Sequence, residues 1–464
     1  MAVQRLPLTA IELYHLADDS PRYPNVIGCD LVVSGVLDRD VATRALRKAA
    51  DSHRMMAARL QPRGIRRPFW KLANEQAEQL VWQAWPEDTD GQPDQPFMLP
   101  RIDPQQQITA QYFIQQQGQQ TRFGFRSHHA AVDGVGGLQF VQDFLIHYHQ
   151  LANQVEQPRP RRVDSDLLPK RNHLKLFSRE FAGKLWIQPV AVLGALKFLL
   201  RRVTRMVPNA GHRPVSGPAP TRLISATIPQ SRVARLKQTA TAHGATVNDL
   251  LLAAVFLSIH QTRKRRNWAV ADEWLRLVIP FNIRDVADRR LPAANRATIV
   301  QLDRRDRDFA DPAGLIWGIN HELGNIRGWN LEKTFLLVLK WMSLVPGWIS
   351  RVAGRPVCRA TTVLTNLGAP LERLKLKLPV DEEGRLRAGD LTVEDLQLAV
   401  PLRWQTPLVF AACRYRDRQS LNLHFDCEAV PPDLADELLK RVLDSLEQLS
   451  GLPAPHREAG VQSG

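Results

Sequence analysis

The sequence predicts two mixed α/β domains, and three observations support that prediction. The chain has 464 residues, which is too long for one ordinary hydrophobic core and suits two domains of about 200 residues each. Segments with the character of strands and helices alternate in both halves. A basic region rich in Pro and Gly, from 158 to 220, connects the halves, so we place the boundary between domains 1–215 and 216–464.

Caps and alternation predict the elements of the first half. We expect a helix capped by Thr9, a strand over 26–33, a helix opened by Asp38, and strands over 111–115 and 121–129. In the last strand Phe123 and Phe125 alternate with polar residues, so parity places His129 on their face and His128 on the opposite face. The glycines that follow start a helix.

The second half repeats this alternation. Its expected strands are 223–228, 275–283, 363–366, 396–401, 408–415 and 421–426, and its expected helices are 231–244, 248–260 and 431–449. Earlier in the chain, a long helical stretch is expected from 175 to 207.

Composition narrows the class of protein. The formal net charge is +15 and the pI is near 10.1, a balance that attracts polyanions such as acidic carrier proteins, anionic lipid or phosphate-bearing substrates. No zinc-finger or RNA-binding signature accompanies it, so we expect no nucleic-acid partner. The four cysteines include no CxxC pair, which favours a reducing compartment and no metal site. The absence of a leader pattern predicts a cytoplasmic protein.

One string carries the chemistry. SHHAAVDGVGG contains His128, His129, Asp133 and Gly134 in the order HHxxxDG. This matches the motif of the CoA-dependent acyltransferase superfamily, which resembles chloramphenicol acetyltransferase. The superfamily includes nonribosomal-peptide condensation domains, plant BAHD acyltransferases and wax ester synthase/diacylglycerol acyltransferases.

Further strings resemble the wax ester synthase branch in the same order along the chain. They are VNDLLLAA at 247–254, IPFNIRD at 279–285, LPAANR at 291–296 and TNLGAP at 365–370. Two depart from the branch pattern: Ala294 replaces a glycine before Asn295, and TNLGAP is a loose match. The resemblance implies two chloramphenicol acetyltransferase-like mixed-sheet domains that form a V-shaped pseudo-dimer around a central substrate tunnel.

The resemblance also implies roles for single residues. His129 is the expected general base, since an imidazole with a pKa near ~6.5 accepts protons at neutral pH. Asp133 is expected to pair with Arg284, Gly134 to allow a turn and close approach, and His128 to be structural. The oxyanion candidates are Thr365 and Asn366, and Asn295 is a structural partner.

Purely structural roles for the same residues remain as alternatives. His129 alone would be a satisfied core histidine, Arg284 a solvated surface arginine, and Asn366 a turn residue before Gly368.

The resemblance predicts an O-acyltransferase that moves a fatty acyl group from a thioester to an alcohol or diacylglycerol, as in wax ester or triacylglycerol synthesis. The donor is expected to be acyl-CoA or an acyl carrier protein, and no cofactor or metal is implied. Two alternatives remain: a stand-alone condensation-type enzyme that forms an amide or ester from carrier-bound acyl groups, and a non-catalytic acyl- or lipid-binding protein.

Two basic apolar segments, 179–207 and 331–352, mix Trp, Leu and Val with Lys or Arg. This pattern is typical of interfacial helices, which would place the protein peripherally at a membrane or lipid droplet. Buried crossover helices with basic flanks fit the same pattern.

Overall fold

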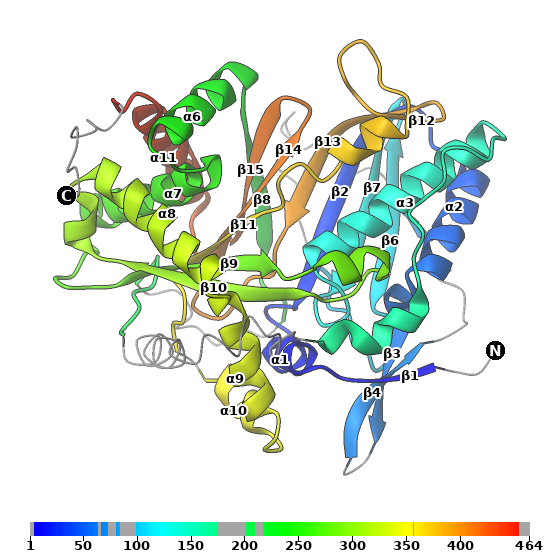
Figure 1. Ribbon diagram of the computed structural model, residues 1–464, viewed down its shortest axis with the longest axis horizontal. Helices are drawn as coiled ribbons and strands as arrows, with labels where there is room; N and C mark the ends of the chain where they lie inside the picture. Colours follow the sequence, from blue (N-terminus) through cyan, green and yellow to red (C-terminus); the bar gives the residue numbers. More distant parts are fainter. Residues whose placement is uncertain are drawn as a thin grey trace, which may run out of the picture.

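The computed structural model describes residues 4–63, 66–72, 80–83, 99–173, 201–208, 217–355 and 357–453. Within them the chain forms two mixed α/β lobes, each built on a six-stranded sheet (Figure 1). The predicted fold class is therefore confirmed. The boundary at 215/216 lies outside the described residues and stays a prediction, as does the central tunnel.

The first lobe has the strand order β12-β13-β2-β7-β6-β5. These strands are β2 (Val26–Ser34), β5 (Leu80–Gln83), β6 (Ala110–Gln117), β7 (Gln120–His128), β12 (Arg387–Ala388) and β13 (Leu391–Ala399). Helices α2 (Arg39–Ser52) and α3 (Gly134–Ala152) cover one face of this sheet (Figure 1). Because β12 and β13 come from the second half of the chain, a cut at 215/216 would not separate the two sheets.

Strand β7 confirms the predicted alternation but ends one residue early. Phe123 and Phe125 face α3, and the Phe123 ring stacks on Phe144 with centroids 4.3 Å apart. On the opposite face, Arg126 pairs with Asp30 at 2.5 Å. The strand ends at His128 and a turn follows, so the parity argument, which assumed an unbroken strand, does not apply to His129.

The second lobe has the strand order β10-β9-β11-β14-β15-β8. These strands are β8 (Thr221–Ile228), β9 (Leu275–Asn282), β10 (Ala297–Arg304), β11 (Thr362–Asn366), β14 (Leu408–Tyr415) and β15 (Arg418–Asp426). Its helices are α6 (Gln230–Ala242), α7 (Val247–Arg265), α8 (Pro312–Gly328) and α11 (Pro432–Ser450). Strand β10 and helix α8 were not anticipated from the sequence.

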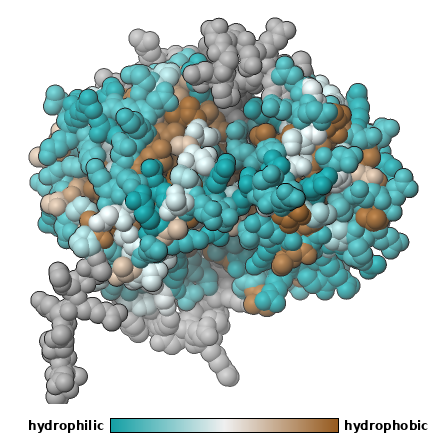
Figure 2. Space-filling view, turned by 90° about the horizontal axis from the view of Figure 1, so that it is seen from above, coloured by the Kyte–Doolittle hydropathy of each residue, from teal (hydrophilic) through white to brown (hydrophobic). Residues whose placement is uncertain are grey.

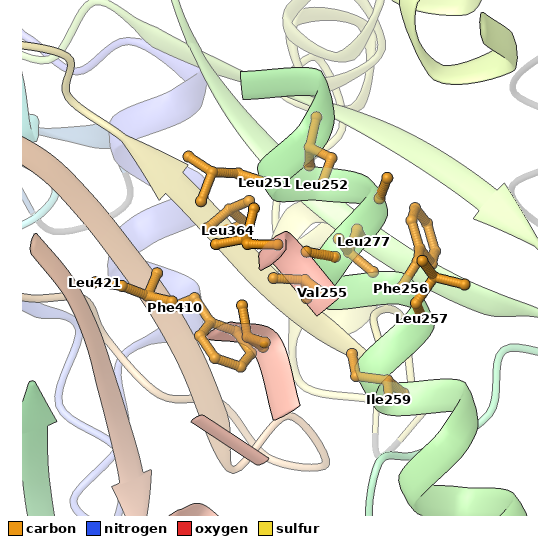
Figure 3. Packing of buried hydrophobic residues seen from close by; sticks show 14 of the residues in the cluster. Leu251, Leu252, Val255, Phe256, Leu257, Ile259, Leu277, Leu364, Phe410 and Leu421 are labelled. Carbon is orange, nitrogen blue, oxygen red and sulfur yellow. The ribbon is translucent and has the colours of Figure 1, made fainter. Parts of the chain in front are cut away.

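Helix α7 lies at the centre of this lobe. Thr246 caps it through the backbone N–H of Asp249. Its apolar residues are buried almost all round, and they pack against strand residues Leu277, Leu364 and Phe410 (Figure 3). A helix that is apolar all round must be covered on every side, which explains why sheet, α8 and α11 enclose it.

A small third sheet and several short helices complete the fold. The sheet has the order β1-β4-β3, formed by β1 (Gln4–Pro7), β3 (Ala58–Arg63) and β4 (Arg66–Leu72). The 3₁₀ helices are η1 (Arg54–Ala57), η2 (Ser165–Asn172), η4 (Val286–Arg290), η5 (Asp306–Phe309), η6 (Leu331–Lys333) and η7 (Glu372–Leu376).

Helix α1 (Ala10–Asp18) supports a pair of short helices. Thr9 and Glu12 form a capping box at its start. Helices α9 (Thr334–Met342) and α10 (Trp348–Ala353) pack on α1 through an apolar cluster that includes Tyr14, and they project from the body of the molecule (Figure 1). Segment 331–352 is thus three short helices, broken where Gly347 adopts a φ of 73°.

The other basic apolar segment is only partly visible. Residues 174–200 lie outside the described part of the chain, and 201–207 form bends and an isolated bridge. The helix predicted to reach residue 207 is therefore wrong at its end.

The surface and the helix lengths bear on a possible contact with membranes. The face seen in Figure 2 is largely hydrophilic, with hydrophobic side chains in separate patches. Among the described residues, each helix taken alone is too short or too polar to cross a bilayer, and only the sharply bent pair α6–α7 meets the length and hydropathy criteria together.

Candidate active site

The HHxxxDG string forms the turn between β7 and α3. His128 is the last residue of the strand, and Asp133 is the N-cap of α3, where its Oδ1 accepts a hydrogen bond from Gly136 N at 2.7 Å. The residues between them are held by backbone bonds, among them Ala131 N to His128 O at 2.9 Å. A strand end and a capped helix thus fix both ends of a short turn that presents His129.

One ring nitrogen of His129 has a fixed role. Nδ1 lies 3.1 Å from the carbonyl oxygen of Val132. Because a carbonyl oxygen only accepts hydrogen bonds, Nδ1 carries the proton and Nε2 carries the lone pair. Among the described residues Nε2 has no hydrogen-bond partner, so its lone pair is not used within the fold.

The backbone of His129 is also tied on both sides. Its N–H donates to Asn25 O at 2.8 Å, and its carbonyl accepts from Asn295 Nδ2 at 2.7 Å. Asn295 therefore joins the turn of the first lobe to the segment between β9 and β10. This contact is consistent with the structural role expected for Asn295.

Burial lowers the pKa of His129 below its ordinary value, although the charge of Asp133 and the Val132 hydrogen bond act in the opposite direction. The lowered pKa keeps the imidazole neutral at neutral pH. A neutral ring with a bare Nε2 is the form that a general base needs.

Asp133 and Arg284 form the predicted ion pair. The two terminal guanidinium nitrogens contact the two carboxylate oxygens at 2.8 and 3.0 Å. Oδ2 also accepts from Arg296 N at 2.6 Å, and Arg284 donates to Ala294 O at 2.7 Å. Burial alone would raise the pKa of Asp133, but Arg284 and these N–H donors hold it below the usual value. The bland interpretation of Arg284 as a solvated arginine is wrong.

His128 is enclosed in the fold. Its Nδ1 accepts a hydrogen bond from Ala130 N at 3.1 Å. Burial lowers its pKa to about 3, so the ring is neutral. It has no accessible surface, and this enclosure supports the expected structural role.

Close approach occurs at Gly136 rather than at Gly134. A Cβ added to Gly134 would lie 3.4 Å from Leu367, an ordinary contact. A Cβ added to Gly136 would lie 3.0 Å from Ala294 O and 3.1 Å from Ala294 N. These are backbone atoms of the other half of the chain, so Gly136 is the residue that lets α3 dock there.

The oxyanion candidates lie at the end of β11. Asn366 donates to Asn248 Oδ1 at 3.1 Å and accepts from Gly368 N at 2.9 Å, so its amide already has two partners and holds the turn. Thr365 is buried in β11. The donor role of either residue stays a prediction.

Two residues of the site were missed by sequence reasoning. His15 of α1 stacks on His129, with ring centroids 4.1 Å apart and planes 29° from parallel. Asn25 accepts from His129 N and donates from Nδ2 to His15 O at 3.1 Å. Neither residue belongs to the motif, and contact between α1 and the β7–α3 turn has no local signature in the sequence.

Metal-ligating side chains do not gather in the described residues: no group of three or more His, Cys, Asp or Glu there could hold an ion.

Comparison with known proteins extends this description. Protein-family models give no match. Two curated relatives, the uncharacterized proteins MT2362 and Rv2305 from two strains of Mycobacterium tuberculosis, are each 27% identical over 314 residues, which is 66% of this chain and 68% of the relative.

Solved structures match far more of the chain. The first condensation domain of the calcium-dependent antibiotic synthetase aligns with a TM-score of 0.70 over 97% of both chains at 16% identity. The chain has the condensation-domain fold. The starter condensation domain of rhizomide synthetase, in complex with C8-CoA, covers 97% of this chain and 96% of its own, with a TM-score of 0.66 at 15% identity. The SgcC5 protein from Streptomyces globisporus gives 0.66 over 97% and 99%, at 14% identity.

This fold agrees with the one expected from the HHxxxDG resemblance. In this condensation-domain fold, the His129 turn belongs to the first lobe, and Arg284 and Asn295 reach it from the second half of the chain.

Proposed function

We propose that this protein is an acyltransferase that moves an acyl group from a thioester to an alcohol-type acceptor, with His129 as general base. The observation that carries the proposal is the hydrogen bond from His129 Nδ1 to Val132 O, which leaves Nε2 with a lone pair. A proton acceptor of fixed tautomer and neutral charge is what attack by a hydroxyl requires.

The reaction then balances without a further group. Nε2 takes the hydroxyl proton while the oxygen attacks the thioester carbonyl carbon, and a tetrahedral oxyanion forms. The carbonyl reforms as the C–S bond breaks, and the protonated Nε2 returns the proton to the departing sulfur. The products are an ester and a free thiol. General base catalysis of this kind contributes about 10²- to 10⁴-fold.

Acyl-CoA is the donor we favour. The rhizomide starter domain, which shares this fold, was solved with C8-CoA bound. A net charge of +15 also favours a ligand that carries several phosphates. The donor acts as substrate, and the proposal includes no cofactor.

A lipid acceptor is favoured by the outer surface of α9 and α10. Five apolar side chains there form what we call the α9–α10 ridge, and their exposed fractions are Val338 40%, Trp341 69%, Leu344 60%, Val345 48% and Trp348 45%. From 333 to 360 the chain carries five Lys or Arg and no Asp or Glu. Exposed Trp and Leu with cations is the composition of helices that lie in the interface of anionic membranes.

The helices that carry the ridge are linked to the proposed base through α1. Helices α9 and α10 pack on α1, whose His15 contacts His129. A pocket beside them is lined by Ile11, Ile283, Leu336 and Asn295, among others. Asn295 connects this pocket to the His129 turn, because its side-chain amide donates a hydrogen bond to His129 O. Peripheral attachment at the ridge would therefore bring a lipid alcohol close to the turn.

A carrier-dependent condensation reaction is the second candidate, because the first condensation domain of the calcium-dependent antibiotic synthetase, solved with a substrate analogue, aligns over 97% of both chains. In this version the acyl group arrives on an acidic carrier protein, and the product is an amide or ester. A non-catalytic acyl- or lipid-binding protein is the remaining alternative.

The deciding experiment measures free thiol released from acyl-CoA with a panel of long-chain alcohols, diacylglycerol and amines. We expect alcohol-dependent release that falls about 10²- to 10⁴-fold in His129→Ala. His321→Ala, an exposed histidine on α8, is the matched control and should behave as the wild type.

Other outcomes assign the alternatives. Turnover only with carrier-loaded acyl groups would favour the condensation reaction. Acyl-CoA binding without turnover in any arm would favour the non-catalytic protein. Turnover that is unchanged in His129→Ala would place the chemistry elsewhere.

A further inference from the structure

We propose that His15 is a positioning residue for His129: its ring holds the plane of the His129 imidazole so that Nε2 faces the acceptor. The inference rests on the proposed role of His129 as general base. His15 lies outside the HHxxxDG string, and the reaction described above gives it no part.

The need for a second constraint follows from geometry. The hydrogen bond from Nδ1 to Val132 O fixes one atom of the His129 ring, but a single bond leaves the ring free to tilt about that atom. Contact with the face of a second ring removes that freedom. His15 supplies this contact with centroids 4.1 Å apart and planes 29° from parallel.

His15 is itself held on a rigid element. Helix α1 begins with the Thr9–Glu12 capping box. Glu12 is fully buried and accepts hydrogen bonds from Arg171 Nε at 2.7 Å and from Trp70 Nε1 at 3.1 Å. The helix is thus anchored to the third sheet and to η2, so a shift of α1 as a whole would break a buried ionic network.

Asn25 links the two histidines directly. Its carbonyl accepts from His129 N at 2.8 Å, and its Nδ2 donates to His15 O at 3.1 Å and to Asp18 Oδ2 at 3.2 Å. Asn25 therefore holds the backbone of both histidines in place. Such a link is expected where two side chains must keep a fixed separation.

The surroundings keep His15 uncharged. Burial lowers the pKa of His15 well below its ordinary value, and His129, His128 and Arg403 act in the same direction. Among the described residues, Asp18 on α1 and Asp133 at the start of α3 also act on His129, and Tyr14, whose hydroxyl accepts from Arg403, lies beside His15. A neutral His15 covers one face of His129 without competing for its proton.

The test compares His15→Ala with His15→Phe. In the alanine variant, water reaches the uncovered face, so the desolvation that lowers the pKa of His129 weakens. We expect that pKa to move up toward 6.5 in an NMR titration of labelled histidines, and kcat/KM to fall about tenfold to hundredfold through misorientation. The phenylalanine variant keeps a flat ring and should restore both quantities to near wild-type values.

Two results would overturn the inference. One is a His15→Ala protein whose His129 titrates as in the wild type and whose kcat/KM is unchanged. The other is a folded His15→Phe protein as defective as His15→Ala, since a flat ring would then be insufficient. Melting temperatures identify variants that fail to fold. The NMR titration needs no turnover, so it tests whether His15 covers the His129 ring even if the acyl-transfer assay fails.

Discussion

Arg284 binds Asp133 through both terminal nitrogens, at 2.8 and 3.0 Å, although the two residues are 151 positions apart. The pair joins the N-cap of α3 in the first lobe to the segment that follows β9 in the second. Both side chains are nearly inaccessible, with 8% and 3% of the surface exposed. The turn that carries His129 is therefore anchored by a residue from the other half of the chain.

Breaking this pair should destabilise the protein. We expect Arg284→Ala to lower the free energy of unfolding by about 3–5 kcal/mol, because it leaves the Asp133 carboxylate buried without its partner. Denaturant unfolding followed by circular dichroism measures the change. Arg289→Ala removes an exposed arginine nearby and should change stability by less than about 0.5 kcal/mol. Equal effects of the two variants would contradict the prediction.

The same pair predicts how stability responds to acid. The pKa of Asp133 is lowered in the folded protein, so its contribution is present above the unfolded-state value near ~3.9 and is lost as the pH falls through the folded-state value. Wild type should lose stability over that acidic range more steeply than Asp133→Asn. Parallel curves would show that Asp133 does not drive the acid response.

The pH dependence of activity should have a low acidic limb. The neutral form of His129 is the active one, so activity falls as the pH drops through its pKa. Because burial lowers that pKa below 6.5, we expect the acidic limb of kcat/KM below pH 6.5. The profile of kcat/KM reports the free enzyme. A limb at or above pH 6.5 would argue against a desolvated His129 as the base.

Gly136 should tolerate no side chain. In Gly136→Ala the new methyl group would lie 2.8 Å from Val132 and 3.0–3.1 Å from the backbone of Ala294, so we expect a loss of about 1–3 kcal/mol and reduced activity. Gly324→Ala on α8 has no atom within 4 Å of the new group and should stabilise its helix by up to about 1 kcal/mol. Thermal melts of the two variants should shift in opposite directions.

The α9–α10 ridge should bind anionic vesicles. We expect Trp341→Glu to reduce co-sedimentation with phosphatidylserine-containing vesicles, because an exposed indole that would insert into the lipid interface is replaced by a charge that anionic lipid repels. Trp317→Glu, which alters a tryptophan of similar exposure on α8 (63% against 69%), serves as the control and should bind as the wild type. If both variants bind equally well, the ridge is not the contact.

Local patterns were sufficient to predict most individual elements. Thr9 and Asp38 each start the expected helix, because a cap acts through hydrogen bonds only three residues away. The alternation around Phe123 gave the correct buried face. Strand β10 was missed, although its alternating burial is clear, because the mixed polar residues of 297–304 weaken the signal in the sequence alone.

Such local patterns could not predict which strands pair when they are far apart in the chain. The entry of β12 and β13 into the first sheet depends on partners such as Val33 and Val393, far apart in the chain, and strand pairing leaves no local trace. The contact of His15 with His129 has the same origin. The motif placed Asp133 beside Arg284 only through resemblance to a family.

The sequence by itself determined the type and approximate limits of most helices and strands, because capping and periodicity are properties of neighbouring residues. It singled out His129 through the resemblance of the HHxxxDG string to a known family. Tertiary structure alone decided which ring nitrogen of His129 carries the proton, that Gly136 rather than Gly134 permits close packing, and that His15 covers the imidazole. Those outcomes depend on distances of a few ångströms between segments brought together by burial of apolar surface, which no local pattern encodes.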